Sequence, residues 1–99
     1  MRLIKYTTKP GRAAENRELI GAVFAGFEEA KVPDLQYAVL ETTEGEFLHV
    51  VETTPEGSKA LQALPAFRAF TANLEDRQVA PLTISELKVV GNYGGLIDQ

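Results

Sequence analysis

The sequence contains no cysteine and no tryptophan, and it holds a single histidine. The lack of cysteine excludes disulfide bonds, thiolate nucleophiles and cysteine-ligated metals. No apolar run approaches the roughly 18–20 residues of a membrane-spanning helix, and the N-terminal stretch lacks the apolar segment of a signal peptide. These absences predict a cytoplasmic protein with no membrane partner.

Basic residues are also scarce, because 10 Lys and Arg stand against 14 Asp and Glu and give a net charge of −4. Binding to nucleic-acid phosphates needs a basic face, so nucleic acid is not an expected partner. One histidine has no second ligand at a recognisable spacing, so the sequence predicts neither a metal site nor a cofactor. The remaining features, 99 residues and 44% hydrophobic content, predict one globular domain over 1–99.

Hydrophobic periodicity predicts the element order β-α-β-β-α-β. Between 12 and 31 the apolar residues recur at helical spacing. A second helical region begins at Pro55 and breaks before Pro65, which suits the first turn of a new helix. This order predicts a ferredoxin-like α+β fold, with a four-stranded antiparallel sheet and both helical regions on one face. The expected strands cover 3–8, 35–43, 46–54 and 81–90.

The hairpin between the second and third strands decides which side chains share a face. Residues 44–45 have the composition of a two-residue turn, which would place Leu40 opposite His49 and Tyr37 opposite Glu52. Both faces of the sheet are then largely apolar, whereas the helices cover only one. We therefore expect a homodimer whose open faces meet around a cavity. The alternative is a monomer with a longer hairpin loop and a shifted register.

With the two-residue turn, Tyr6, Tyr37 and Glu52 fall on the cavity face. A carboxylate buried beside phenol groups could exchange protons with a ligand. Alternatively, Glu52 forms an ion pair with Arg2, Arg68 or a lysine at the mouth of the cavity. The expected apolar lining of the cavity comprises Ile4, Val39, Leu48 and Val50.

His49 has two interpretations. A neutral imidazole is a suitable general base near neutral pH. The predicted register, however, places His49 on the helix-facing side with Phe47 and Val51, where a buried histidine bonded to a backbone group is the structural alternative. Arg68 could hold an anionic ligand, although an exposed helical arginine is more often solvated.

Three stretches carry a resemblance over nearly the whole chain. They are Lys9-Pro10-Gly11 after the first strand, the strand 47–52 that ends in glutamate, and the segment LPAFRAF at 64–70. These stretches resemble the antibiotic biosynthesis monooxygenase-like superfamily of dimeric α+β barrels. The resemblance implies a homodimer with an apolar cavity toward which Glu52 points. For function it implies a cofactor-independent monooxygenase acting on a small aromatic or polyketide-like molecule.

Haem degradation, which other members of the superfamily perform, is not expected here. Those members use an asparagine, a tryptophan and a histidine, and the matching positions in this chain are Ile4, Thr54 and about Thr71. The alternative to an enzyme is a non-catalytic module that binds a small molecule or serves only as an interaction domain.

Overall fold

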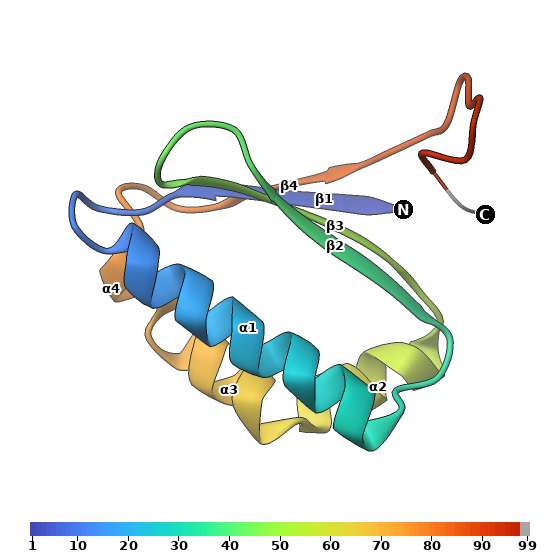
Figure 1. Ribbon diagram of the computed structural model, residues 1–99, viewed down its shortest axis with the longest axis horizontal. Coiled ribbons are helices and arrows are strands. Elements are labelled where there is room, and N and C mark those ends of the chain that lie inside the picture. Colours follow the sequence, from blue (N-terminus) through green and yellow to red (C-terminus); the bar gives the residue numbers. More distant parts are fainter. Residues whose placement is uncertain (98–99) are drawn as a thin grey trace.

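The computed structural model describes residues 1–97, and its elements follow the predicted order (Figure 1). The second helical region is divided into two helices, as the position of Pro65 predicts, and a further single turn follows them. The elements are β1 (Arg2–Thr7), α1 (Ala13–Ala30), β2 (Leu35–Glu41), β3 (Glu46–Thr53), α2 (Pro55–Ala63), α3 (Pro65–Ala72), α4 (Leu74–Arg77) and β4 (Thr83–Glu86).

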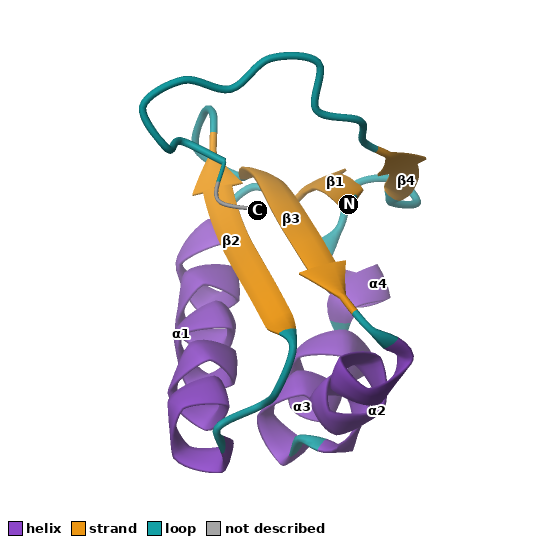
Figure 2. Cartoon of the chain, turned by 90° about the vertical axis from the view of Figure 1, so that its right-hand side faces the viewer, coloured by secondary structure: helices purple, strands orange, loops and turns teal. Residues whose placement is uncertain are grey.

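The four strands form one sheet in the order β2-β3-β1-β4, and each neighbouring pair is antiparallel. The helices lie together on one side of this sheet (Figures 1 and 2). This arrangement confirms the predicted ferredoxin-like α+β fold. Between the two layers lies a core of Tyr6, Ala13, Val23, Phe47, Phe70 and Leu74.

The break between α2 and α3 follows from local sequence. Thr54 caps α2, since its hydroxyl accepts a hydrogen bond from the Gly57 N–H at 3.1 Å. Leu64 has an extended conformation (φ −69°, ψ 127°), as expected for a residue that precedes proline. Pro65 then occupies the first turn of α3, where a missing N–H costs little. The resulting change of direction brings α3 against α1.

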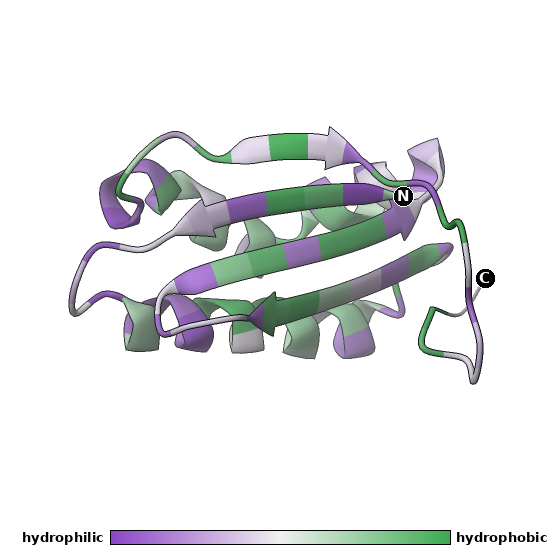
Figure 3. Ribbon diagram, turned by 90° about the horizontal axis from the view of Figure 1, so that it is seen from above, coloured by the Kyte–Doolittle hydropathy of each residue, from purple (hydrophilic) through white to green (hydrophobic). Residues whose placement is uncertain are grey.

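The last strand is shorter than the predicted 81–90, because it pairs with β1 only over Thr83–Glu86. Glu86 lies opposite Arg2. The Leu87 N–H still donates to the Met1 carbonyl at 2.7 Å. The segment 88–97 leaves the sheet (Figure 3), and the side chains of Val90, Tyr93 and Leu96 in it are fully or almost fully exposed.

The predicted hairpin register is wrong by one residue, and the longer loop kept as the alternative is the one observed. Val39 lies opposite His49, and Tyr37 lies opposite Val51. Gly45 has φ +94°, which suits the last position of a three-residue connection over 43–45. Because side chains alternate along a strand, the slip moves every β2 side chain to the face opposite the predicted one.

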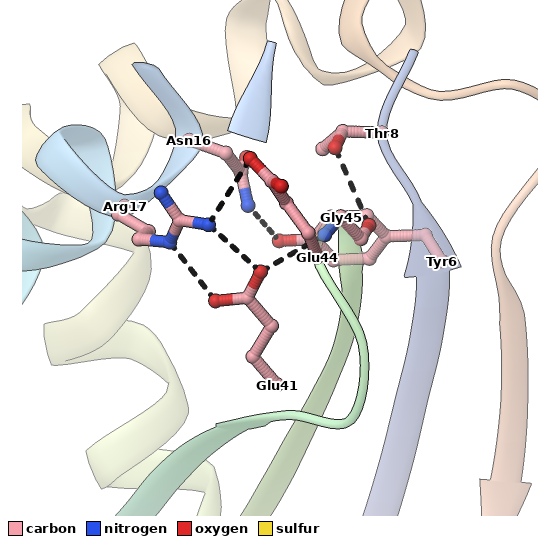
Figure 4. Close-up of polar contacts among 7 residues, drawn as sticks. All are labelled: Tyr6, Thr8, Asn16, Arg17, Glu41, Glu44 and Gly45. Carbon is pink, nitrogen blue, oxygen red and sulfur yellow. Dashed lines mark hydrogen bonds and ion pairs between the residues drawn. The ribbon is translucent and has the colours of Figure 1, made fainter. Parts of the chain in front are cut away.

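A contact between α1 and the hairpin holds this longer loop (Figure 4). Arg17 donates to both carboxylate oxygens of Glu41, at 2.9 and 3.0 Å. The same carboxylate accepts from the Gly45 N–H at 2.9 Å, and the Arg17 guanidinium is the main cause that lowers the pKa of Glu41. On the other side, the Thr8 N–H donates to the Gly45 carbonyl at 2.7 Å. The loop is thereby fixed from both α1 and β1.

The face of the sheet opposite the helices carries a set of apolar side chains that we call the open face: Leu3, Ala38, Leu40, Leu48 and Val50 (Figure 3 looks onto this side). Leu40 is 54% exposed. Leu40 was expected opposite His49 on the helix side, and it lies on the open face instead because of the register slip. Among residues 1–97, no helix is both long and apolar enough to cross a membrane.

Candidate functional site

A continuous series of hydrogen-bonded side chains crosses the interior between the sheet and the helices. The Tyr37 hydroxyl lies 2.8 Å from Nδ1 of His49, and Nε2 of the same ring lies 2.7 Å from the Tyr6 hydroxyl. Asn16 Nδ2 donates to the Tyr6 hydroxyl at 2.9 Å, as Figure 4 shows. Arg77 Nε donates to Asn16 Oδ1 at 3.0 Å. We call these five residues the polar chain.

Strand geometry places the three ring-bearing members. Tyr6 on β1, His49 on β3 and Tyr37 on β2 all project from the helix side of the sheet. Since β3 lies between β1 and β2, the imidazole stands between the two phenols and bonds to one with each ring nitrogen. Asn16 comes from the first half of α1, and Arg77 ends α4.

The polar chain is buried almost completely. Asn16 and Arg77 are 0% exposed, His49 is 3% exposed and Tyr6 is 4% exposed. Their surroundings are aromatic, because the His49 ring lies 5.5 Å from the Phe70 ring and the Arg77 guanidinium lies over the same Phe70 ring at 5.1 Å. In such a setting most buried polar atoms are hydrogen-bonded, as those that link these residues are.

Burial also decides the charge of each member. It lowers the pKa of His49 to about 4, so the imidazole is neutral at pH 7. Burial raises the pKa of Tyr6 to about 12, although the Asn16 hydrogen bond and the Arg77 charge act in the opposite direction. It raises the pKa of Tyr37 as well. Arg77 remains cationic, since a guanidinium stays protonated even where burial lowers its pKa.

A small cavity adjoins the Tyr37 and His49 end of the polar chain. Its volume is about 10 Å³, roughly the space that one water molecule requires. On the outside, between the second half of α1 and the start of β2, lies a groove of about 690 Å³. Phe24 and Tyr37 line both spaces, with their rings edge to face at 5.6 Å. The cavity is lined by Ile20, Val23, Phe24, Tyr37, Val39, His49, Phe67 and Phe70.

The structure brings Tyr6, Tyr37 and His49 together, although the predicted register separated His49 from the tyrosines. Tyr6 and Tyr37 do not lie on the open face as predicted: the three-residue hairpin loop turns Tyr37 to the helix side, and Tyr6 lies there because β1 pairs it with Phe47. Ile4 and Val39 move with them, since both lie opposite His49 on the helix side. His49 itself faces the helices as predicted, but its partners are phenols rather than backbone groups.

The remaining predicted residues lie elsewhere. Glu52, Leu48 and Val50 are on the open face as expected, so Glu52 is separated by the sheet from the tyrosines with which it was grouped. Its carboxylate is 2.6 Å from the Met1 amino group, a different partner from the basic side chains considered for it. Arg68 is exposed, and its Nε donates to the Gln62 carbonyl at 3.2 Å.

Sequence reasoning missed Asn16 and Arg77, although their positions carry a signal. Asn16 follows Ala13 by three residues and precedes Ile20 by four, so it stands within the apolar stripe of α1. Arg77 likewise follows Leu74 by three residues and is fully buried. A polar residue at a core position of a helix indicates a buried polar partner, because burial without one is costly.

No protein-family model matches the chain, and no curated protein matches it in sequence. Solved structures do match its fold. A candidate antibiotic biosynthesis monooxygenase from Caulobacter crescentus is 18% identical, with 91% of this chain and 88% of that chain covered and a TM-score of 0.70. The protein PA3566 from Pseudomonas aeruginosa is 16% identical over 91% of this chain and 92% of that chain, with a TM-score of 0.71.

A conserved protein from Methanosarcina mazei gives a similar result, at 16% identity and a TM-score of 0.69 over 85% of this chain and 86% of that chain. At such identities the likeness concerns the fold. It confirms the expected resemblance to antibiotic biosynthesis monooxygenase-like proteins at that level, across almost the whole chain.

Proposed function

We propose that the protein binds a small planar aromatic molecule between the sheet and helices α1 and α3, and oxidises it with molecular oxygen without a cofactor. The observation that carries this proposal is the cluster of Tyr37, His49 and Tyr6 beside a cavity with aromatic walls. Buried titratable groups that converge on an apolar cavity are a common feature of active sites. The name of the Caulobacter crescentus protein supports the same reaction class.

The proposed pocket differs in place from the one expected between two sheets, because the ring-bearing residues lie inside the protomer. At about 10 Å³ the cavity is too small for an aromatic molecule. Phe24 lines both this cavity and the outer groove, and we propose that rotation of its side chain joins the two spaces. We propose the groove as the entrance.

The low pKa of His49 limits what this residue can do in the proposed reaction. An imidazole with a pKa of about 4 is neutral at pH 7, yet it is a weak base that cannot readily deprotonate an ordinary phenol. The substrate therefore has to bind as a phenolate or enolate that has already formed in water, a form that anthrones and quinols can adopt. The protein would hold the resulting oxyanion and exclude water, and the electron-rich ring would react with oxygen directly.

The reaction proposed for an anthrone balances without an external reductant. The ring methylene loses two hydrogens and becomes a carbonyl, which is a four-electron oxidation. One atom of molecular oxygen enters that carbonyl, and the other leaves as water with the two hydrogens.

Oxygen uptake with a panel of anthrones and quinols tests the proposal. We expect turnover by the wild-type protein and at least a tenfold loss in Tyr37→Phe, with Tyr93→Phe as the matched control on the fully exposed tyrosine. Turnover of none of these compounds, or equal turnover by Tyr37→Phe, would contradict it. The weak basicity of His49 favours a second candidate, a non-catalytic binding module, for which binding of the same compounds without oxygen uptake is expected.

Two further expectations from the sequence, the homodimer and the cytoplasmic location, remain proposals. We propose that the open face pairs with the open face of a second copy, since its apolar side chains, Leu40 among them, are not covered by the helices. We also propose a cytoplasmic location.

A further inference from the structure

The hydrogen bonds of the polar chain run in one direction from donor to acceptor, and Arg77 sets this direction. A guanidinium has only donors, so the Asn16 atom that faces Arg77 Nε is the amide oxygen. The Asn16 amide nitrogen then faces the Tyr6 hydroxyl and donates to it. The first two bonds therefore both point away from Arg77.

The direction continues through His49. The Tyr6 oxygen already accepts from Asn16, and the buried Tyr6 hydroxyl proton has an acceptor in Nε2 of His49 at 2.7 Å. If Nε2 carried a proton instead, the Tyr6 proton would be left buried without this acceptor, which is unfavourable. In a neutral imidazole the proton then resides on Nδ1, and Nδ1–H donates to the Tyr37 oxygen at 2.8 Å.

Tyr37 is the last member of the polar chain, and its hydroxyl proton takes part in none of the hydrogen bonds of that chain. Within residues 1–97 its hydroxyl has His49 as its hydrogen-bond partner, and in that bond it accepts. Its own proton is thus available at the wall that separates the small cavity from the outer groove. A ligand atom that accepts a hydrogen bond would complete the series.

Arg77 also supplies charge. The guanidinium is 0% exposed and bonds to Asn16 and to the Phe70 carbonyl at 2.8 Å, while its Nη1 has no hydrogen-bond partner among residues 1–97. No carboxylate of that range forms an ion pair with it. A buried cation at one end of aligned hydrogen bonds polarises them in one sense, so the donor at the far end is strengthened.

From this geometry we infer that Arg77 and Asn16 are positioning residues that orient the polar chain so that the Tyr37 hydroxyl donates to an oxyanion of the bound ligand. The ligand class is a planar aromatic phenolate or enolate, because the donor stands among Phe24, Phe67 and Phe70. This inference rests on the proposed binding site and is independent of the oxygen reaction.

Asn16→Asp tests the direction of the hydrogen bonds in the polar chain separately from the support that these bonds give to the structure. Its carboxylate has the shape of the amide, pairs with Arg77 and accepts from Tyr6 instead of donating to it. The Tyr6 oxygen then accepts a hydrogen bond from Nε2–H of His49. Nδ1 of His49 becomes an acceptor, and the Tyr37 hydroxyl donates its proton to that nitrogen. Every bond of the polar chain is kept: Arg77 still donates to position 16, and the three bonds from there to Tyr37 reverse their direction. Asn73→Asp on the exposed end of α3 is the matched control.

Nitrogen-15 NMR reads the direction, because His49 is the only histidine in the chain. We expect the Nδ1–H tautomer in the wild type and in Asn73→Asp, and the Nε2–H tautomer in Asn16→Asp. The probe is 4-nitrophenolate, whose visible absorption reports its ionisation. We expect it to bind the wild type and to bind Asn16→Asp about tenfold or more weakly, the worth of one charge-assisted hydrogen bond.

An Nε2–H tautomer in the wild type overturns the inference, and this measurement does not depend on whether the variant folds. An unchanged tautomer in a folded Asn16→Asp overturns it as well. Failure of 4-nitrophenolate to bind the wild type overturns the ligand class. Oxygen uptake plays no part in these outcomes, so an absence of turnover would refute the proposed reaction and leave the direction of the polar chain intact.

Discussion

The two faces of the sheet consist of alternating residues of the same strands, yet they carry different kinds of side chain. The helix face carries Tyr6, Tyr37 and His49, whose polar atoms bond to one another beneath α1 and α3. The open face carries aliphatic side chains, and Glu52 at its margin pairs with the Met1 amino group. The difference supports the proposals that assign ligand binding to the helix face and association to the open face.

Neighbouring residues on the two faces give the largest expected contrast. Phe47 is 2% exposed in the core, so Phe47→Ala should lower the free energy of unfolding by about 3–5 kcal/mol. Leu48 lies on the open face, and Leu48→Ala should cost about 1 kcal/mol or less in the isolated protomer. Urea unfolding at low protein concentration measures both, and equal losses would contradict the assignment of the two residues to opposite faces.

The pH dependence of stability should come next in size. The pKa of His49 is about 4 in the folded protein and 6.5 as the ordinary value, so between these pH values the unfolded chain binds a proton that the folded chain does not. Stability should therefore fall by about 3 kcal/mol as the pH drops from about 6.5 to about 4, and His49 should add no further loss below that.

His49→Gln is the control for this prediction, because an amide can donate and accept but does not titrate. Unfolding measured in urea across the same pH range should be nearly flat for this variant above pH 5. A wild type without the fall, or a variant with the same fall, would show that His49 is not the titrating group.

A smaller effect is expected from the hydroxyl of Tyr37. Tyr37→Phe removes the hydrogen bond to His49 and should lower the free energy of unfolding by about 1 kcal/mol. Tyr93→Phe, at a fully exposed position, should leave it unchanged. Thermal unfolding of the pair measures the difference, and an equal effect of the two substitutions would place the Tyr37 hydroxyl outside the polar chain.

The smallest effect on the folded protomer is expected on the open face. Leu40 is 54% exposed, so Leu40→Lys should change the stability of the protomer by no more than about 0.5 kcal/mol. The same change should abolish a homodimer formed through this face. Light scattering after size exclusion reports the mass, and a mass equal to that of the wild type would contradict association through the open face.

Much of the fold could be predicted because its signals are local. The helical spacing of α1, the break at Pro65 and the glycine of the hairpin each act within a few residues. The hairpin register could not be predicted, since the loop that sets it is held by Arg17, which is 24 residues from its partner Glu41. A single extra loop residue then reversed the faces of β2.

The candidate site could be predicted only in part for a related reason. Tyr6, Tyr37 and His49 were recognised as chemically capable residues, but their grouping depended on the register. Asn16 and Arg77 lie 61 residues apart in the chain and meet only when α4 closes on the start of α1. A polar residue in an apolar stripe indicates that a partner exists, and the folded structure identifies it.

The most direct test of the contrast between the faces is to locate a bound phenolate. Isotope-labelled protein titrated with 4-nitrophenolate would report, by NMR, which side chains change their chemical shifts. Binding on the helix face predicts shifts for His49 and for the aromatic ring of Phe24, with the methyl groups of Leu48 and Val50 unmoved. Shifts confined to Leu48 and Val50 would place the ligand on the open face and contradict the account.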